Sequence, residues 1–315
     1  MIQVENVTKK YGQRLAVDSL TFGVSRGEIL GFLGPNGAGK STMMNIITGY
    51  LSATEGTVTV DGHDILEEPA EAKRRIGYMP ELPPLYLEMT VQDYLSFVSD
   101  IKGVPRSRRR EGMDRAMELL RIADVRPRLI KNLSKGYRQR VGIAQALIGS
   151  PDVLILDEPT IGLDPQQIIE TRTLIRDLGR EHTIILSSHI LPEVQAVCDR
   201  VLIINRGRIV ASGTPEGLSR GMAGEGRLML RVAGTEEEAR AVLAEVAHVA
   251  SVQPAGAREP GTVDVVVTAE TGFDIRAGVF TAFARANRPL LGLKTMDFTL
   301  EDIFLNLITE EKEAS

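Results

Sequence analysis

The sequence predicts an α/β protein, in which a mixed or parallel sheet flanked by helices is followed by a smaller α+β domain. After Pro151, apolar strands without polar alternation, such as 153–156 and 183–186, are separated by helical segments. That pattern is typical of a parallel sheet covered on both faces. The glycine-rich segment 34–41 lies between an apolar strand and a helix, which is a second α/β pattern. With 315 residues, the chain has room for two ordinary domains.

The first half of the chain changes from strands to helices. Short strands are predicted at residues 2–8, 19–24, 28–33 and 57–60. The segment that starts at Lys40 has apolar residues at helical spacing and predicts a helix. Most of residues 91–150 is helical, with interruptions near 103–105 and at Pro127, so we expect a helical subdomain at about 88–150.

The second half contains a predicted domain boundary. Helices are expected at 166–180 and 190–197, and strands at 200–205 and 208–212. Gly and Ser accumulate at 219–226, which separates a domain of residues 1–220 from one of residues 221–315. The later segments are predicted as strand 227–233, helix 235–247, strands 248–253 and 262–268, helix 273–287 and strand 289–296. That order fits a split βαβ module of ferredoxin-like type.

Composition disfavours several classes of protein: nucleic-acid binders, disulfide-linked or cysteine-metal proteins, and proteins that span a membrane. Lys and Arg number 37 against 42 for Asp and Glu, a net charge of −5, so no nucleic-acid partner is expected. Cys198 is the only cysteine, which excludes an intrachain disulfide and a cysteine metal cluster. No window has the roughly 18 apolar residues that span a bilayer, and no signal-peptide core is visible. We therefore expect a cytosolic protein whose membrane role, if it has one, comes through a partner.

One segment predicts a phosphate-binding loop. It reads Gly34-Pro35-Asn36-Gly37-Ala38-Gly39-Lys40-Ser41, followed by Thr42, and fits the pattern G-x-x-x-x-G-K-[ST]. Backbone N–H groups in such a loop converge on phosphate oxygens, and the following helix N-terminus adds positive potential. Lys40 is expected to reach the β- and γ-phosphates, and the Ser41 hydroxyl to ligate Mg²⁺. The alternative is a turn that binds nothing, but the flanking strand and helix favour a nucleotide site.

Two acids end the apolar strand 153–156. Asp157 is expected to hold Mg²⁺, and Glu158 is placed to polarise the attacking water. The carboxyl end of a buried parallel strand opens into the ligand crevice, which suits both roles. The alternative is a strand end capped by solvated acids.

At this point the sequence resembles the nucleotide-binding subunits of ATP-binding cassette (ABC) transporters over about residues 1–220. The segment 133–140, LSKGYRQR, is similar to that family's LSGGQ signature and keeps Ser134 and Gly136. The resemblance implies an ABC-type P-loop NTPase domain, in which the signature addresses the γ-phosphate held by the opposite subunit. An ordinary helix N-cap at Ser134 is the alternative.

Three more residues fall where the resemblance predicts function. Tyr11 corresponds to the aromatic residue that stacks on adenine, and Asp164 to the D-loop that lines the partner's site. His189 corresponds to the switch histidine that contacts the γ-phosphate. Their alternatives are a core aromatic residue, a turn that starts a helix, and a structural histidine.

The sequence departs from the family pattern at two places. Glu81 stands where the family usually has the Q-loop glutamine, and its oxygen still suits Mg²⁺ but adds negative charge. In the signature, Lys135 replaces a glycine and Tyr137 replaces the glutamine. These variants, with the segment 300–305 (LEDIFL), look like the ABC-2 type exporter subgroup, and within it like the ATPases of gliding-motility and copper-assembly (nitrous oxide reductase maturation) systems.

The resemblance implies an ATPase that forms a dimer with a second copy around ATP and Mg²⁺. It further implies integral membrane permease subunits as partners, a position on the cytoplasmic face of the membrane, and ATP hydrolysis that drives export. Two alternatives remain open: a cytosolic cassette ATPase acting on the ribosome or nucleic acid, and an ATP-sensing regulatory module. The sequence does not indicate the transported substrate.

Overall fold

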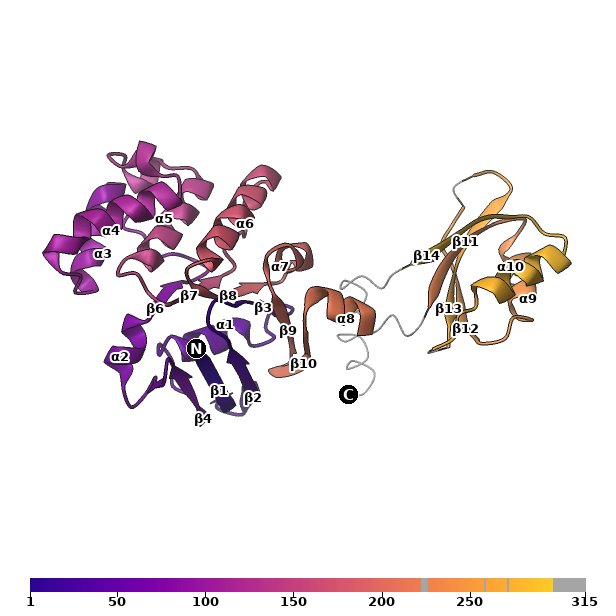
Figure 1. Cartoon of the computed structure of the whole chain (residues 1–315), viewed down its shortest axis with the longest axis horizontal. Helices are drawn as coiled ribbons and strands as arrows, with labels where there is room; N and C mark the ends of the chain where they lie inside the picture. Colours follow the sequence, from indigo (N-terminus) through magenta and orange to yellow (C-terminus); the bar gives the residue numbers. More distant parts are fainter. Residues whose placement is uncertain (222–225, 258, 271, 297–315) are drawn as a thin grey trace. The chain divides into compact units, whose positions relative to one another are not determined.

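The computed structural model describes residues 1–221, 226–257, 259–270 and 272–296. It divides the chain into two compact units, Met1–Pro215 and a second that begins at Glu216 (Figure 1). The segment 300–305, on which the exporter resemblance partly depends, lies outside the described residues. Within the described ranges, no helix has both the length and the apolar character needed to cross a membrane.

The first unit contains two sheets. An antiparallel sheet has the order β2-β1-β4-β5, built from β1 (Ile2–Tyr11), β2 (Arg14–Val24), β4 (Glu55–Val60) and β5 (His63–Asp64). A larger sheet has the order β10-β9-β3-β8-β7-β6, built from β3 (Ile29–Leu33), β6 (Ile76–Met79), β7 (Val153–Asp157), β8 (Thr183–Ser188), β9 (Arg200–Asn205) and β10 (Arg208–Gly213).

The larger sheet is mixed. Strands β6, β7, β8, β3 and β9 pair in parallel, whereas β10 pairs antiparallel with β9. Strand β10 is antiparallel because only the two-residue turn Arg206-Gly207 connects it to β9, and so short a connection can only join antiparallel strands. Both turn residues have positive φ. The sequence had not indicated β6 or the short helix α2 (Pro69–Arg74).

Helix α1 (Lys40–Ile47) lies in the core between the two sheets. Its residues Met43, Met44, Ile46 and Ile47 belong to one buried cluster with residues of both sheets, among them Val4 of β1 and Phe32 of β3. Burial on more than one side fixes the start of α1, and therefore the loop before it, against the end of β3.

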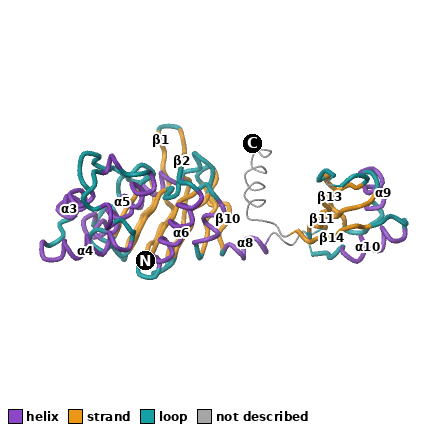
Figure 2. Tube along the Cα trace, turned by 90° about the horizontal axis from the view of Figure 1, so that it is seen from above, coloured by secondary structure: helices purple, strands orange, loops and turns teal. Residues whose placement is uncertain are grey.

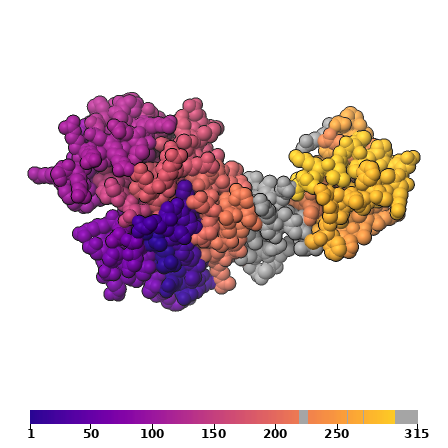
Figure 3. All heavy atoms as spheres, in the orientation of Figure 1, coloured from indigo at the N-terminus to yellow at the C-terminus, as the bar shows by residue number. Residues whose placement is uncertain are grey.

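A helical subdomain projects from this core. It contains α3 (Val91–Ile101), α4 (Arg106–Leu119) and α5 (Lys135–Leu147), which gather apart from β1, β2 and β4 (Figures 1 and 3). Thr90 caps α3 by accepting a hydrogen bond from the Asp93 backbone N–H. The remaining helices of the unit are α6 (Pro165–Gly179) and α7 (Leu191–Val197), and α8 (Pro215–Gly221) follows at the division between the units.

The second unit has two layers, a four-stranded sheet and two helices (Figure 2). Its elements are β11 (Arg227–Ala233), α9 (Glu236–Leu243), β12 (Val249–Pro254), β13 (Thr262–Ala269), α10 (Arg276–Arg285) and β14 (Leu290–Met296). The sheet is antiparallel with the order β12-β13-β11-β14. Alternate residues of β11, such as Leu228 and Leu230, are buried in one cluster with Leu243 of α9 and Phe283 of α10.

Candidate functional site

The glycine-rich loop 34–39 connects β3 to α1. Gly37 and Gly39 have φ values of 81° and 108°, a region that favours glycine. At Gly39, a Cβ atom would lie 2.6 Å from the Ala16 carbonyl oxygen, so the loop passes too close to β2 for any side chain. The sequence therefore places glycine where the backbone must turn and approach its neighbour.

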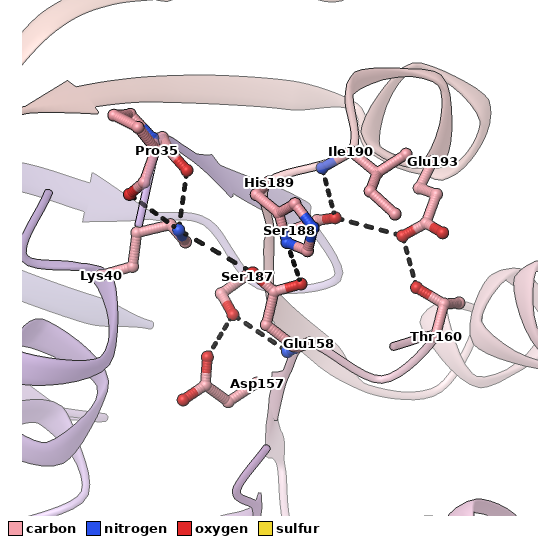
Figure 4. Close-up of polar contacts among 11 residues, drawn as sticks. Pro35, Lys40, Asp157, Glu158, Thr160, Ser187, Ser188, His189, Ile190 and Glu193 are labelled. Carbon is pink, nitrogen blue, oxygen red and sulfur yellow. Dashed lines mark hydrogen bonds and ion pairs between the residues drawn. The ribbon is translucent and has the colours of Figure 1, made fainter. Parts of the chain in front are cut away.

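Lys40 begins α1 and is only 6% exposed. Its Nζ donates hydrogen bonds to the carbonyl oxygens of Gly34 (2.7 Å) and Pro35 (3.2 Å), and lies 3.8 Å from Glu158 Oε1 (Figure 4). Burial lowers the pKa of Lys40, and the nearby carboxyl groups, Glu158 first, oppose that shift. The ammonium group thus lies among oxygen acceptors from the start of the loop and from Glu158.

Two acids lie at the carboxyl end of β7: Asp157 is its last residue and Glu158 follows it. Asp157 is 2% exposed and accepts a hydrogen bond from Ser187 Oγ, while the Glu158 N–H donates to the same Oγ (3.1 Å). Glu158 Oε2 lies 2.9 Å from Nδ1 of His189, which follows β8. Burial raises the pKa of Glu158, and the hydrogen bond to His189 and the charge of Lys40 partly oppose that rise. The carboxyl ends of β3, β7 and β8 therefore bring lysine, acids and histidine together, as neighbouring parallel strands allow.

These groups border a cavity of about 630 Å³, the size of a small-molecule site. Its lining residues are Tyr11, Arg14, Ala16, Asn36, Gly37, Gly39, Lys40, Ser41, Thr42, Glu81, Glu158, Ile161 and His189. Gly34, Pro35 and Ala38 belong to the same loop, and Asp157 lies behind it with Ser187. Sequence reasoning missed Arg14, which follows Tyr11 across the turn between β1 and β2 and adds a cation to the cavity wall.

The donor atoms at this cavity fit Mg²⁺ better than a transition metal. The side-chain oxygens of Ser41, Glu81 and Asp157 are hard ligands. Within the described residues, there is no group of three or more His, Cys, Asp or Glu side chains that could hold a metal ion. Ser41 and Glu81 line the cavity and Asp157 ends β7, and Mg²⁺ is usually held by one or two carboxylates together with substrate phosphates.

The signature and D-loop residues border a different pocket, of about 240 Å³. Its lining residues are Ser134, Gly136, Tyr137, Arg140, Asp164, Gln166, Gln167 and Glu170. Ser134 is the N-cap of α5 and Asp164 the N-cap of α6, each accepting a backbone hydrogen bond from the residue three positions on. Both pocket walls are therefore helix N-termini, which favour anions.

The two signature variants have contacts of their own. Tyr137 donates a hydrogen bond from its hydroxyl to Asp124 (3.1 Å), which ties the start of α5 to the turn after α4. The Lys135 ammonium packs against Gly162, so that a Cβ atom at position 162 would collide with it. Lys135 thus contacts the D-loop of its own chain.

Comparison with known proteins decides the family. A model of the ABC transporter family matches residues 17–161. The linearmycin resistance ATP-binding protein LnrL of Bacillus subtilis is 35% identical, over 98% of this chain and 98% of its own length. The chain belongs to the ATP-binding subunits of ABC transporters. As an ABC ATPase it binds ATP and hydrolyses it, and the hydrolysis is coupled to transport.

Other relatives of this ABC ATPase match about two thirds of the chain. The bacitracin transport ATP-binding protein BcrA of Bacillus licheniformis is 38% identical over 67% of this chain and 68% of its own length. A solved ATP-binding subunit of an ABC transporter covers 71% of the chain with a TM-score of 0.64 at 29% identity, and 93% of that structure is matched. The dimeric, post-hydrolysis structure of the ATP-binding cassette MJ0796 with ADP and phosphate covers 68%, with a TM-score of 0.62 at 25% identity, and 98% of that structure is matched.

Proposed function

We propose that the cavity at the carboxyl ends of β3, β7 and β8 binds ATP together with Mg²⁺. In this proposal Lys40 contacts the β- and γ-phosphates, Tyr11 stacks on adenine, and Ser41, Asp157 and Glu81 provide oxygen ligands. Bound Mg²⁺ neutralises the charge that develops on the phosphates during transfer. The supporting observation is that Lys40 already lies among acceptors of the loop and within 3.8 Å of Glu158.

Glu158 orients the attacking water in this proposal. A general base must lie within hydrogen-bond reach of the proton that it accepts, and Glu158 lines the cavity beside Lys40. His189 and Glu81, which line the same cavity, report the presence of the γ-phosphate. If Glu158→Gln retains steady-state hydrolysis, this assignment of the base is wrong.

Each complete site needs two subunits. The observation that carries this proposal is that the cavity with Lys40 and the pocket with Ser134, Gly136 and Asp164 share no lining residue. We infer that the second pocket closes over the ATP held by a second copy of the chain, so that Ser134 and Gly136 meet its γ-phosphate. Two solved dimeric structures of one homologous cassette, MJ0796, support the arrangement.

Dimerisation can be measured directly. Glu158→Gln, which should bind ATP without turning it over, is expected to elute as a dimer with ATP and Mg²⁺ and as a monomer without nucleotide. The matched control is the double variant with Lys40→Ala, which should stay monomeric in both conditions. A monomer at saturating ATP for Glu158→Gln would contradict the composite site.

We further propose that the ATPase drives a membrane permease of the ABC-2 type on the cytoplasmic face, for export. Two of its relatives are named for linearmycin resistance and for bacitracin transport, and the segment 300–305 resembles the exporter subgroup, including the gliding-motility and copper-assembly ATPases. Tagged Glu158→Gln should purify from detergent-solubilised membranes with a polytopic protein at near-equal stoichiometry when ATP and Mg²⁺ are present. Recovery of ribosomes or DNA would favour a cytosolic cassette protein.

The residues after about 220 form a separate accessory domain in this proposal. We classify it as ferredoxin-like, on its element order and its strand order β12-β13-β11-β14, and assign it a docking, dimerisation or regulatory role. A chain truncated after residue 220 should then lose dimerisation or coupling. If the truncated chain dimerises, hydrolyses ATP and couples hydrolysis to transport normally, the proposed role of the accessory domain is wrong.

A further inference from the structure

A buried carboxyl group lies behind the cavity, on helix α7. Glu193 is 2% exposed and does not line the cavity. Its Oε2 accepts hydrogen bonds from Thr160 Oγ1 and from Ser188 Oγ (3.1 Å) (Figure 4). Its Oε1 is enclosed, and has no hydrogen-bond partner in the part of the chain that the structure describes.

The two hydroxyl groups belong to different segments of the chain: a turn after β7 and the end of β8. Thr160 lies in the turn that runs from Glu158 to Asp164, the N-cap of α6. Ser188 immediately precedes His189, and its Oγ also accepts a hydrogen bond from the Ile190 N–H (2.9 Å). Glu193 therefore holds the Ser188 hydroxyl, which in turn bonds the backbone on the other side of His189. With the same oxygen, Glu193 holds Thr160 in the turn after Glu158.

Fold stability does not explain a carboxyl group at this position. A buried polar oxygen without a partner costs free energy, and an apolar side chain of similar volume would avoid that cost. The bonds that Glu193 does make connect two loops of the site, which indicates a role in their arrangement.

We propose that Glu193 is a positioning residue for ATP hydrolysis, fixing the loop of His189 against the turn that joins Glu158 to Asp164. This inference rests on the proposed roles of Glu158 and His189. Because that turn ends at the pocket of Ser134 and Gly136, the network of Thr160, Glu193 and Ser188 links the cavity to the second pocket within one chain. In the dimer, a change in the conformation of one ATP site would then change the conformation of the other through this network.

Matched pairs of variants test the proposal. Thr160→Val keeps the shape of the side chain but removes the hydroxyl, and it is expected to lower kcat about tenfold, the effect of one lost buried hydrogen bond. Thr160→Ser keeps the hydroxyl and should retain most of the wild-type kcat. The dissociation constant for ATP should be the same in both, because Thr160 does not line the cavity.

Glu193 provides the second pair, on a different helix. Glu193→Gln keeps an acceptor for both hydroxyls, whereas Glu193→Leu removes it, so kcat should fall for Leu and be largely retained for Gln. Equal kcat values within each pair, in proteins with normal thermal unfolding, would overturn the proposal. If Glu193→Leu does not fold, the Thr160 pair decides.

A double-mutant cycle separates positioning from general destabilisation. If Thr160 acts through His189, Thr160→Val should change kcat much less in a His189→Ala background than in the wild type. A full tenfold effect in both backgrounds would contradict that route. The proposed role of Glu158 is tested separately by Glu158→Gln. If that variant still hydrolyses ATP, the assignment of Glu158 as the base fails, and if only the Thr160 and Glu193 variants behave like wild type, this inference alone fails.

Discussion

Nδ1 of His189 lies 2.9 Å from Oε2 of Glu158, although the two residues are 31 positions apart in the chain. The contact exists because β7 and β8 are parallel neighbours, with Asp157 opposite Ser187, so that the residues after both strands meet at one edge. Burial raises the pKa of Glu158, and His189 opposes that rise. The imidazole therefore helps to keep the carboxyl group ionised.

This relationship predicts a pH dependence. In the proposed mechanism hydrolysis needs Glu158 deprotonated. The acidic limb of the kcat/KM profile, which reports the free enzyme, should therefore lie above the ordinary range for glutamate. His189→Gln removes a group that lowers the pKa of Glu158. The acidic limb of the activity that this variant retains should therefore move to higher pH. The measurement is kcat/KM for ATP against pH for both proteins.

The control is His182→Gln, because the His182 ring bonds the Pro151 carbonyl oxygen and does not line the cavity. Its profile should match the wild type. An acidic limb for His189→Gln that stays in place or moves to lower pH would contradict the assignment.

The loop glycines should differ in their tolerance of a side chain. Gly39→Ala combines a φ of 108° with a Cβ atom 2.6 Å from the Ala16 carbonyl oxygen, whereas Gly37→Ala has a φ of 81° and no atom within 4 Å. Both variants carry backbone strain of about 1–2 kcal/mol, but only Gly39→Ala must move the loop. We expect Gly39→Ala to lose ATP binding and Gly37→Ala to weaken it about tenfold, measured by titration with a fluorescent ATP analogue. Equal affinities would show that the close approach to β2 is unimportant.

The phosphate loop could be predicted from the sequence because its residues are contiguous and its chemistry is local. Strand β6 could not: it is only four residues long and contains Gly77, and it is a strand because Ile76 pairs with Val153 of β7. The network of Thr160, Ser188 and Glu193 joins residues up to 33 positions apart and has no sequence pattern. The contiguous motifs pointed to the ABC transporter ATPases, the family that the comparisons show, whereas the contacts behind the site required the three-dimensional arrangement.

Tyr11 should contribute to nucleotide affinity through its ring. It lines the cavity and is 47% exposed, and Lys9 Nζ lies over its ring, 5.4 Å from the centroid. Stacking of an aromatic side chain on a base contributes about 1–3 kcal/mol, so Tyr11→Ala should weaken ATP binding about tenfold or more, and Tyr11→Phe should leave it nearly unchanged. Tyr50→Ala is the control, because Tyr50 is exposed but does not line the cavity. Similar affinities for Tyr11→Ala and Tyr11→Phe would exclude stacking.

Lys102 should stabilise the helix that begins at the signature. Its Nζ donates hydrogen bonds to the carbonyl oxygens of Gln145 (2.9 Å), Ala146 (3.0 Å) and Ile148 (2.8 Å), at the C-terminal end of α5. A cation there satisfies carbonyl groups that have no partner within the helix and complements the helix dipole. Lys102→Met keeps most of the aliphatic chain but removes all three bonds, and should lower the free energy of unfolding of the first unit by about 2 kcal/mol.

Urea unfolding, followed by circular dichroism, measures this change. The control is Arg108→Met, an exposed residue near the start of α4, for which the unfolding midpoint should change little. Because α5 carries Ser134 at its opposite end, Lys102→Met should also weaken the ATP-dependent dimer of Glu158→Gln, while leaving the ATP affinity of the monomer intact. An unchanged unfolding midpoint for Lys102→Met would mean that water can replace the ammonium group at these carbonyl oxygens without lowering the free energy of unfolding.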